Sequence, residues 1–266
     1  MDIKIIYEDN DVLIVDKPAG IVVFCEAPVR SPQAKEGNIY LIDELIKKYP
    51  KLAELGVPPR YGIAHRLDKD TSGILLVAKN SEALIFLQKQ FSAVASAFAK
   101  ATADKKDLAD KKNSQILEKS IEKRYIALVE GDVKEDNGTI HTLIGRSPKD
   151  PRKQKAYSLN EAKTGRREAI TEYKVLERYE EYTLLEVQIK TGRRHQIRCH
   201  LSYLQHPIAG DKLYGFKKSP IPDGLTRQFL HASYLKIQLP NGKTEEFKSD
   251  LPEELQKTLK ILNSKF

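Results

Sequence analysis

The stretch Gly62–Lys79, GIAHRLDKDTSGILLVAK, constrains this chain more than any other segment. It ends in an apolar run, Ile74–Ala78, of the kind that forms a buried strand. Asp68 and Gly73 lie before and at the start of that run, among Asp, Thr, Ser and Gly residues that favour a tight turn. Gly73 also permits backbone angles that a side chain would forbid. The pattern predicts a charged loop held on a rigid strand, an arrangement that often carries chemistry.

Asp68 has plainer interpretations when it is considered alone. With Arg66 it could form an ordinary surface ion pair beside a loop, and the two residues by themselves favour that view. A metal-dependent nuclease or hydrolase using Asp68 and Asp70 fits less well, because no further acidic or histidine cluster accompanies them. The six His and two Cys show no metal-ligand spacing, so we predict no metal site.

Composition restricts the class of protein. The chain has 266 residues, of which 40% are hydrophobic and 31% charged, as in globular proteins. No apolar run approaches the ~20 residues of a membrane span, and the N-terminus lacks the pattern of a secretory signal. Cys25 and Cys199 lie far apart, which fits a reducing compartment. We therefore expect a cytoplasmic protein without a membrane partner, and its net charge of +8 favours a polyanion such as nucleic acid.

Alternating apolar and polar residues dominate the second half of the chain. The segments Ala169–Leu176 and Tyr182–Ile189 alternate with period two and predict neighbouring strands. Phe229–Leu239 and Thr244–Lys248 flank an Asn-Gly turn and predict a hairpin, whereas Gly145–Tyr157 is expected to be loop. Few helices separate the strands, so the pattern indicates an α+β fold with a mixed, mostly antiparallel sheet and flanking helices.

Three further local predictions concern element ends and pairing. Ile39–Tyr49 has helical periodicity and is expected to be capped by Asn38. The strand Arg124–Glu130 is expected to pair back with Thr139–Ile144 through an Asp-Asn-Gly turn. Asp250 is expected to cap the C-terminal helix.

The string HRLD-x-x-TSG-x-x-x-x-AK resembles the signature of the RluA-type pseudouridine synthases, which modify RNA. Four more blocks agree with that family in the same order: DVLIVDKPAG (Asp11–Gly20), EKRYIALVEG (Glu122–Gly131), TGRRHQIRCHL (Thr191–Leu201) and HPIAGDKLYG (His206–Gly215). The resemblance covers nearly the whole chain, and five ordered blocks are much harder to obtain by chance than one motif.

The resemblance implies the pseudouridine synthase fold, with one catalytic domain over residues 1–266 and a catalytic cleft along a long central sheet. The small N-terminal RNA-binding domain of S4 type that many members carry is expected to be absent, because the matching blocks start at residue 1. Residues 92–122, rich in Ala, Lys, Asp and Ser, are predicted to be an inserted, partly helical segment. It is either a helical segment that projects into solvent, which we favour, or an additional RNA-contacting arm. We expect a monomer.

The resemblance also implies roles for particular residues. Asp68 would be the catalytic carboxylate, kept ionised by Arg198. Tyr125 would stack on the uracil and take or relay the proton that leaves C5. Five residues would contact the substrate: Arg66, entering the space left by the flipped nucleotide, Leu67 and Ile197, lining the pocket, and Arg193 and His195.

The function implied by this resemblance is the isomerisation of specific uridines to pseudouridine in ribosomal or transfer RNA, without a cofactor. Asp68 would either attack C1′ or remove a proton from C2′, and the sequence does not choose between them. The alternative is a catalytically inactive RNA-binding protein of the same fold. The presence of Asp68, Tyr125 and Arg198 together favours the enzyme.

Overall fold

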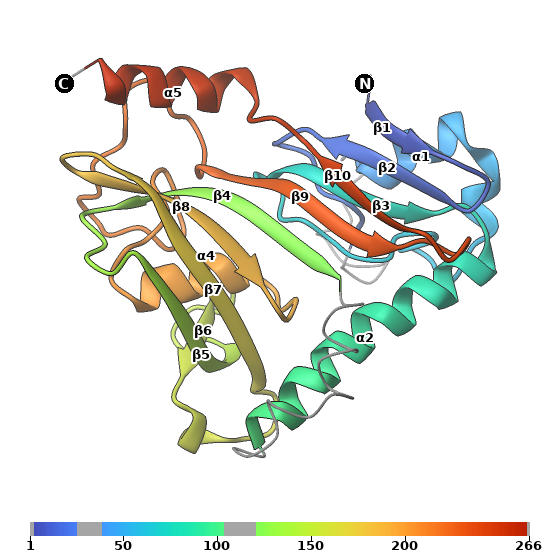
Figure 1. Ribbon diagram of the computed structural model, residues 1–266, viewed down its shortest axis with the longest axis horizontal. Coiled ribbons are helices and arrows are strands. Elements are labelled where there is room, and N and C mark those ends of the chain that lie inside the picture. Colours follow the sequence, from blue (N-terminus) through green and yellow to red (C-terminus); the bar gives the residue numbers. More distant parts are fainter. Residues whose placement is uncertain (1–2, 26–38, 104–120, 265–266) are drawn as a thin grey trace.

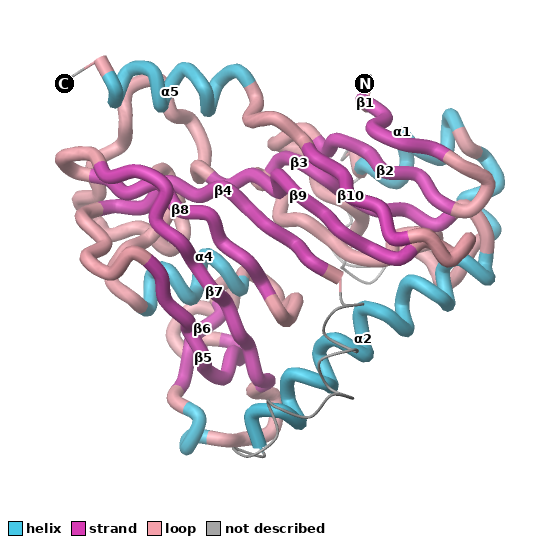
Figure 2. The backbone as a smooth tube through the Cα atoms, in the orientation of Figure 1, coloured by secondary structure: helices cyan, strands magenta, loops and turns pink. Residues whose placement is uncertain are grey.

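The computed structural model describes residues 3–25, 39–103 and 121–264. Ten strands in this part of the chain form one mixed sheet in the order β1-β2-β3-β9-β4-β8-β7-β5-β6, with β10 paired to β9 (Figures 1 and 2). The strands are β1 (Lys4–Glu8), β2 (Val12–Lys17), β3 (Ser72–Ala78), β4 (Glu122–Glu130), β5 (Asn137–Arg146), β6 (Gln154–Tyr157), β7 (Arg167–Arg178), β8 (Tyr182–Ile189), β9 (Leu230–Gln238) and β10 (Thr244–Lys248). Among the described strand pairs, β3–β9 is parallel and the others are antiparallel. The predicted α+β fold with a long, mostly antiparallel sheet is confirmed.

The helices cover both faces of the sheet. They are α1 (Leu41–Lys48), α2 (Ser81–Ala103), α4 (Gln196–Tyr203) and α5 (Glu253–Asn263), with short 3-10 turns η1 (Pro50–Glu54) and η2 (Leu159–Glu161). The long helix α2 extends from the β1–β3 end of the sheet towards the β5–β7 end in the view of Figure 1. Within the described residues, no helix has the length and apolar character needed to span a membrane.

Strand β2 explains why the N-terminal part of the sheet is rigid. Its side chains alternate between two apolar clusters, with Leu13 on the side of α1 and Ile14 on the side of α2. A strand covered on both faces carries a nearly continuous apolar sequence, as VLIV does here. Strand β3 pairs with β2 from Gly73 to Ala78 and is also fully buried, so the loop that precedes β3 is attached to a rigid strand.

The predicted pairing of the central strands was wrong. Strand β4 pairs with β8 and β9, whereas β5 pairs with β6 and β7. The expected turn at Asn137 is the first residue of β5, opposite Lys174 of β7. The predicted loop over residues 145–157 also contains strand β6. Alternation shows that a segment is a strand, but it does not identify the neighbouring strand.

Two helix starts also differ from prediction. Helix α1 begins at Leu41, because Tyr40 stays extended (φ −107°, ψ 150°) in a bridge with Val22. Asn38, the predicted cap, lies outside the described residues. At α5 the cap position is Pro252 with no side-chain cap bond, so Asp250 does not cap this helix.

The segment predicted as an insertion is described only in part. Helix α2 continues without a break to Ala103, and β4 begins at Glu122. Residues 104–120 lie outside the described residues. The inserted nature of 92–122 therefore stays a prediction.

Candidate active site

Asp68 lies in the tight loop that leads into β3. The backbone N–H of Thr71 donates to the Asp68 carbonyl at 3.1 Å and closes the turn. Gly73 has φ +111°, and a Cβ atom there would lie 2.2 Å from the carbonyl oxygen of Ala232 in β9. Only glycine fits where the loop enters the sheet, which accounts for this residue in the TSG string.

A buried lysine fixes the loop from behind. The Lys17 side chain is fully buried, and its Nζ donates to the carbonyls of Pro18, Ile21 and Lys69 at 2.8, 3.0 and 3.0 Å. Burial lowers the pKa of Lys17 to about 7, whereas three carbonyl acceptors match the three protons of an ammonium group. Lys17 thereby joins the end of β2 to the loop that carries Asp68.

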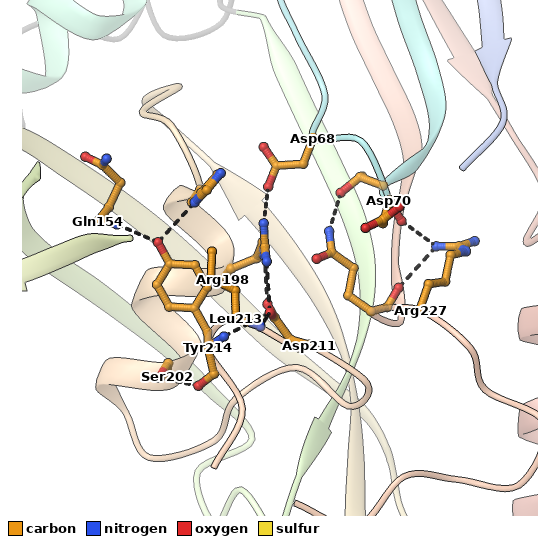
Figure 3. Close-up of polar contacts among 12 residues, drawn as sticks. Asp68, Asp70, Gln154, Arg198, Ser202, Asp211, Leu213, Tyr214 and Arg227 are labelled. Atoms are coloured by element: carbon orange, nitrogen blue, oxygen red, sulfur yellow. Dashed lines mark hydrogen bonds and ion pairs between the residues drawn. The ribbon is translucent and has the colours of Figure 1, made fainter. Parts of the chain in front are cut away.

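Arg227 and Gln228, which lie just before β9, hold the other end of the same loop. The Arg227 guanidinium donates to the Asp70 carbonyl at 3.0 Å and to the Ser72 hydroxyl at 2.9 Å. The Gln228 amide donates to the Thr71 hydroxyl at 2.9 Å. Figure 3 shows Arg227 beside Asp70, with their hydrogen bond drawn. The backbone on both sides of Asp68 is thus fixed by buried side chains.

On its other side the loop presents the Asp68 carboxylate to Arg198 of α4. Nη1 of Arg198 donates to Asp68 Oδ2 at 2.9 Å, while Nε and Nη2 bind the two oxygens of Asp211 at 2.7 and 2.8 Å (Figure 3). Asp211 also accepts the backbone N–H groups of Leu213 and Tyr214. One guanidinium therefore bridges two carboxylates, and the fully buried Asp211 fixes its orientation.

The charges in this bridge stabilise one another. Burial opposes the charge of Arg198, but its hydrogen bonds and charge pairs with Asp211 and Asp68 outweigh that cost and raise its pKa. Burial likewise opposes the charge of Asp211, and Arg198 with two backbone N–H groups lowers the pKa of Asp211 below its ordinary value. Both groups are charged at neutral pH, as a buried hydrogen-bonded ion pair requires.

A cavity of about 380 Å³ opens in front of Asp68. Every site residue expected from the sequence lines it: Asp68, Tyr125, Arg198, Arg66, Leu67, Ile197, Arg193 and His195. These residues come from the loop before β3, from β4, and from the β8–α4 connection with α4. The volume lies in the range of sites that enclose small ligands.

Tyr125 occupies the β4 wall of this cavity. It is 6% exposed and pairs across the sheet with Val187 and Ala232. Burial, and then the charge of Asp68, raises the pKa of Tyr125. Its hydroxyl is therefore protonated at neutral pH.

His195 and Arg193 also line the cavity, from the segment just before α4. His195 has left-handed backbone angles (φ 54°, ψ 23°), and its Nδ1 lies 3.1 Å from the Tyr214 hydroxyl. Burial lowers the pKa of His195 to about 4, so the ring is neutral at pH 7. The Nε of Arg193 donates to the Glu168 carbonyl at 2.9 Å, which engages one of its five donors with the protein.

Sequence reasoning missed the roles of Asp211 and Tyr214. Both belong to the block HPIAGDKLYG, yet nothing in that block distinguishes a buried carboxylate from an exposed one. Tyr214 accepts the N–H of Gln154 at 2.7 Å and contacts His195, so it braces the wall of the cavity. A buried Arg198 requires a second acid to offset its desolvation, and that argument predicts a partner but does not identify it.

Among the described residues, no group of three or more His, Cys, Asp or Glu is arranged to hold a metal ion. The charged groups that line the cavity are the Asp68 carboxylate and several Lys and Arg side chains, and Tyr125 lines it beside them. This set suits acid–base or nucleophilic chemistry by Asp68 on an anionic substrate.

Comparison with known proteins gives a consistent result. The family model described as RNA pseudouridylate synthase matches residues 11–97 and 101–203. An uncharacterised RNA pseudouridine synthase of Bacillus subtilis is 36% identical over 263 residues, which is 98% of this chain and 73% of that protein. A ribosomal large subunit pseudouridine synthase D of Neisseria meningitidis is 35% identical over 271 residues, covering 98% of this chain and 62% of its own length.

A solved structure agrees. The human RNA pseudouridylate synthase domain containing 1 protein superimposes with a TM-score of 0.63 at 25% identity, covering 94% of this chain and 84% of that one. These matches confirm the expectation of an RluA-type synthase at the level of the family. They also confirm the expected enzyme class, an isomerase that acts on uridine in RNA. By these matches, the chain belongs to the RNA pseudouridylate synthase family.

Proposed function

We propose that this protein isomerises uridine to pseudouridine in ribosomal RNA, with Asp68 as the catalytic carboxylate. One observation carries the proposal: the Asp68 carboxylate is held by Arg198 at the wall of a cavity that Tyr125 also lines. Retention of this arrangement is hard to explain for a protein that only binds RNA, because a carboxylate facing a polyanion weakens binding.

The reaction is an isomerisation, so its atoms balance without a co-reactant. The N1–C1′ bond of the uridine breaks, the base turns, a C5–C1′ bond forms, and C5 loses the proton that N1 gains. Arg198 engages Oδ2 of Asp68, and in this proposal Oδ1 is the oxygen that acts on the substrate. From this position Asp68 either attacks C1′ or takes the proton of C2′, and both routes need an ionised carboxylate.

Tyr125 has two functions in this proposal. Its ring provides an aromatic surface for the uracil, which keeps the detached base in the cavity. Its hydroxyl relays the proton that leaves C5. Because the pKa of Tyr125 is raised, the hydroxyl acts as a protonated relay and not as a phenolate base.

The cationic side chains of the cavity serve access and binding. A uridine must leave its stack to reach Asp68, at a cost of a few kcal/mol. Arg66 lies in the same loop, two residues from Asp68, and lines the cavity; in this proposal its side chain fills the vacated space. Leu67 and Ile197, each 5% exposed, form apolar walls for the base, and Arg193 and His195 complete the rim.

The choice of ribosomal RNA rests on relatives whose names refer to the large ribosomal subunit, from Neisseria meningitidis and Xanthomonas campestris. Transfer RNA, the other substrate implied by the sequence resemblance, is the second candidate. Modification of bacterial ribosomal RNA takes place in the cytoplasm, where we place this protein, and we propose that it acts as a monomer.

The decisive experiment maps pseudouridines across total RNA from cells with and without this gene. We expect sites in large-subunit ribosomal RNA that vanish with the gene and return with the wild-type protein, but not with the Asp68→Asn variant. Sites that appear only in transfer RNA would move the substrate to the second candidate. An unchanged pseudouridine map, with RNA still bound by the purified protein, would establish the inactive RNA-binding alternative.

A further inference from the structure

A second cation lies in the cavity, on the same strand as Tyr125. Lys123 precedes Tyr125 by two residues in β4, so both side chains project from the same face of the sheet and both line the cavity. The Nζ of Lys123 lies 5.1 Å from the ring centre of Phe91 in α2. The Phe91 ring in turn lies 5.2 Å from the ring of His65. Lys123 thus occupies the end of the cavity next to α2.

Lys123 has no acidic partner within the described part of the chain. Its strand neighbours Glu122 and Arg124 form an ion pair with each other. Asp68, the acid of the cavity, is engaged by Arg198. Desolvation lowers the pKa of Lys123 to about 8, with no neighbouring charge acting against it. An unpaired cation is costly to desolvate, and such a group in a cleft is a candidate for ligand binding.

The groups that face Lys123 leave this end of the cavity without negative charge. His65 accepts the N–H of Leu76 through Nε2 at 3.0 Å, and burial, followed by the charge of Lys123, lowers its pKa to about 3. Lys190 is paired with Glu172 at 2.9 Å. The other charged groups lining the cavity are cations, apart from Asp68: Arg60, Arg66, Arg167, Arg193, Arg194 and Arg198.

We propose that Lys123 binds a backbone phosphate of the RNA strand beside the nucleotide whose uridine enters at Asp68. This inference rests on the proposed function, because it takes the bound strand to be RNA with its uridine at Asp68. A phosphodiester carries a full negative charge, and it would supply the anionic partner that Lys123 does not have among the described residues. A carbonyl oxygen of the uracil carries no such charge. The aromatic ring of Phe91 and the neutral His65 shape the space around the cation.

The first test measures binding of a labelled RNA decamer with a single central uridine. Lys123→Met keeps the length of the side chain and removes its charge, and should weaken binding about tenfold, or about 1.4 kcal/mol. It should also make the log–log salt slope shallower by about 0.7, the value for one phosphate on a single strand. Lys123→Arg should retain both properties. Lys243→Met, in the exposed β9–β10 turn, is the control and should match wild type.

The second test locates the phosphate. Methylphosphonate linkages are neutral, so each phosphate around the uridine can be neutralised in turn. At one position the substitution should weaken wild-type binding about tenfold yet leave Lys123→Met almost unchanged, which is the non-additivity expected of a direct pair. Equal losses in both proteins at every position would overturn the proposal.

The third test uses pH. A bound phosphate raises the pKa of Lys123 above its free value of about 8, so binding takes up a proton at higher pH. Affinity of the wild type should therefore fall between pH 8 and 9.5 relative to Lys123→Arg, which stays charged. Parallel pH profiles for the two proteins would contradict the assignment.

These readouts separate this inference from the proposed function. Binding and its coupling to one phosphate do not require turnover, so they remain measurable if the wild type makes no pseudouridine. In an active wild type, Lys123→Met should raise KM with little change in kcat, as loss of uniform binding predicts. A loss confined to kcat, with binding intact, would place Lys123 in the chemical step and overturn the phosphate assignment.

Discussion

The loop around Asp68 is held in different ways on its two sides. On the side away from the cavity, Lys17, Arg227 and Gln228 bind mainly backbone carbonyls and hydroxyls. On the cavity side, Arg198 binds the carboxylate itself. The first set fixes the position of the loop, and the second holds the carboxylate that we propose as the reacting group.

The two aspartates of the loop illustrate this difference. The Asp68 side chain is 16% exposed and ion-paired within the cavity. Asp70 is exposed and contributes its backbone carbonyl to Arg227, not its carboxylate. Under the proposed function, the carboxylate of Asp68 takes part in the reaction, whereas Asp70 contributes only its backbone carbonyl to the loop. Substitutions on the cavity side should therefore reduce turnover, whereas substitutions on the other side should reduce stability and leave turnover nearly unchanged.

The largest expected effect is that of Asp68→Asn. The amide keeps the size of the side chain and a hydrogen-bonding oxygen for Arg198, so the variant should fold and bind RNA. It should form no detectable pseudouridine, because an amide neither attacks C1′ nor accepts a proton from C2′. The measurement is pseudouridine formation within the true substrate RNA under single-turnover conditions. Asp70→Asn is the matched control and should stay within about twofold of wild type, since exposed substitutions have small effects; near-normal turnover by Asp68→Asn would refute the assignment.

Tyr125→Phe should have the next largest effect. The ring and its packing are kept and the hydroxyl is lost, so binding should be nearly normal. Loss of a positioned proton relay should slow turnover of uridine about 100-fold. In RNA containing 5-fluorouridine, fluorine replaces the hydrogen at C5, so wild type and variant should process it alike up to that step. A variant equally slow on both RNAs would mean that the hydroxyl acts earlier or that Tyr125 only packs.

Asp211→Asn tests the orientation of Arg198. Asp211 does not face the substrate, so the variant should lose activity through misplacement of Arg198 and Asp68, about tenfold in kcat with little change in KM. Disrupting a buried pair should also cost about 3–5 kcal/mol of stability. The exposed pair of Lys257 and Glu253 provides a control, because Glu253→Gln should change neither property appreciably. A normal kcat in Asp211→Asn would show that Asp68 alone positions Arg198.

The stability deficit of Asp211→Asn should depend on pH in a defined direction. The folded protein lowers the pKa of Asp211, so this residue stabilises the fold above its unfolded pKa of about 3.9. That contribution is lost as the pH falls through the lower folded value. Denaturant unfolding should therefore show a constant difference from wild type between pH 5 and 8, and a shrinking difference below about pH 4. A difference that grows in acid would contradict the lowered pKa.

The same comparison explains how far the sequence alone was informative. Asp68, Tyr125 and Arg198 belong to ordered motif blocks, and the structure brings all three to one cavity. Asp211 and Lys123 also lie in motif blocks, but nothing in the local sequence distinguishes them from their neighbours. Their importance depends on which side chains face them across the sheet, and single-sequence patterns contain no such information.

The errors in the fold have a similar cause. Strands β5 and β7 were both predicted as strands, but their pairing was not, and β6 was predicted as loop, because register and neighbour depend on contacts distant in sequence. Tyr40 stays extended because it bridges Val22, a contact that helix propensity does not report. Local periodicity therefore predicted the kinds of elements well and their neighbours and ends less well.

The smallest expected effect on turnover belongs to Gln228→Met, on the side of the loop away from the cavity. Gln228 is 4% exposed, and its amide donates to the Thr71 hydroxyl at 2.9 Å. Methionine has a similar length and leaves that hydroxyl without one donor, which should cost about 1 kcal/mol of stability. Lys17 and Arg227 still hold the loop on either side, so kcat/KM of the folded enzyme should stay within about twofold. Gln256→Met, an exposed residue of α5, is the control for the substitution itself.

Thermal unfolding and single-turnover rates of both variants provide the measurement. A tenfold loss of turnover at normal stability in Gln228→Met would show that this side of the loop acts on the chemistry directly, and the separation between position and reactivity would not hold.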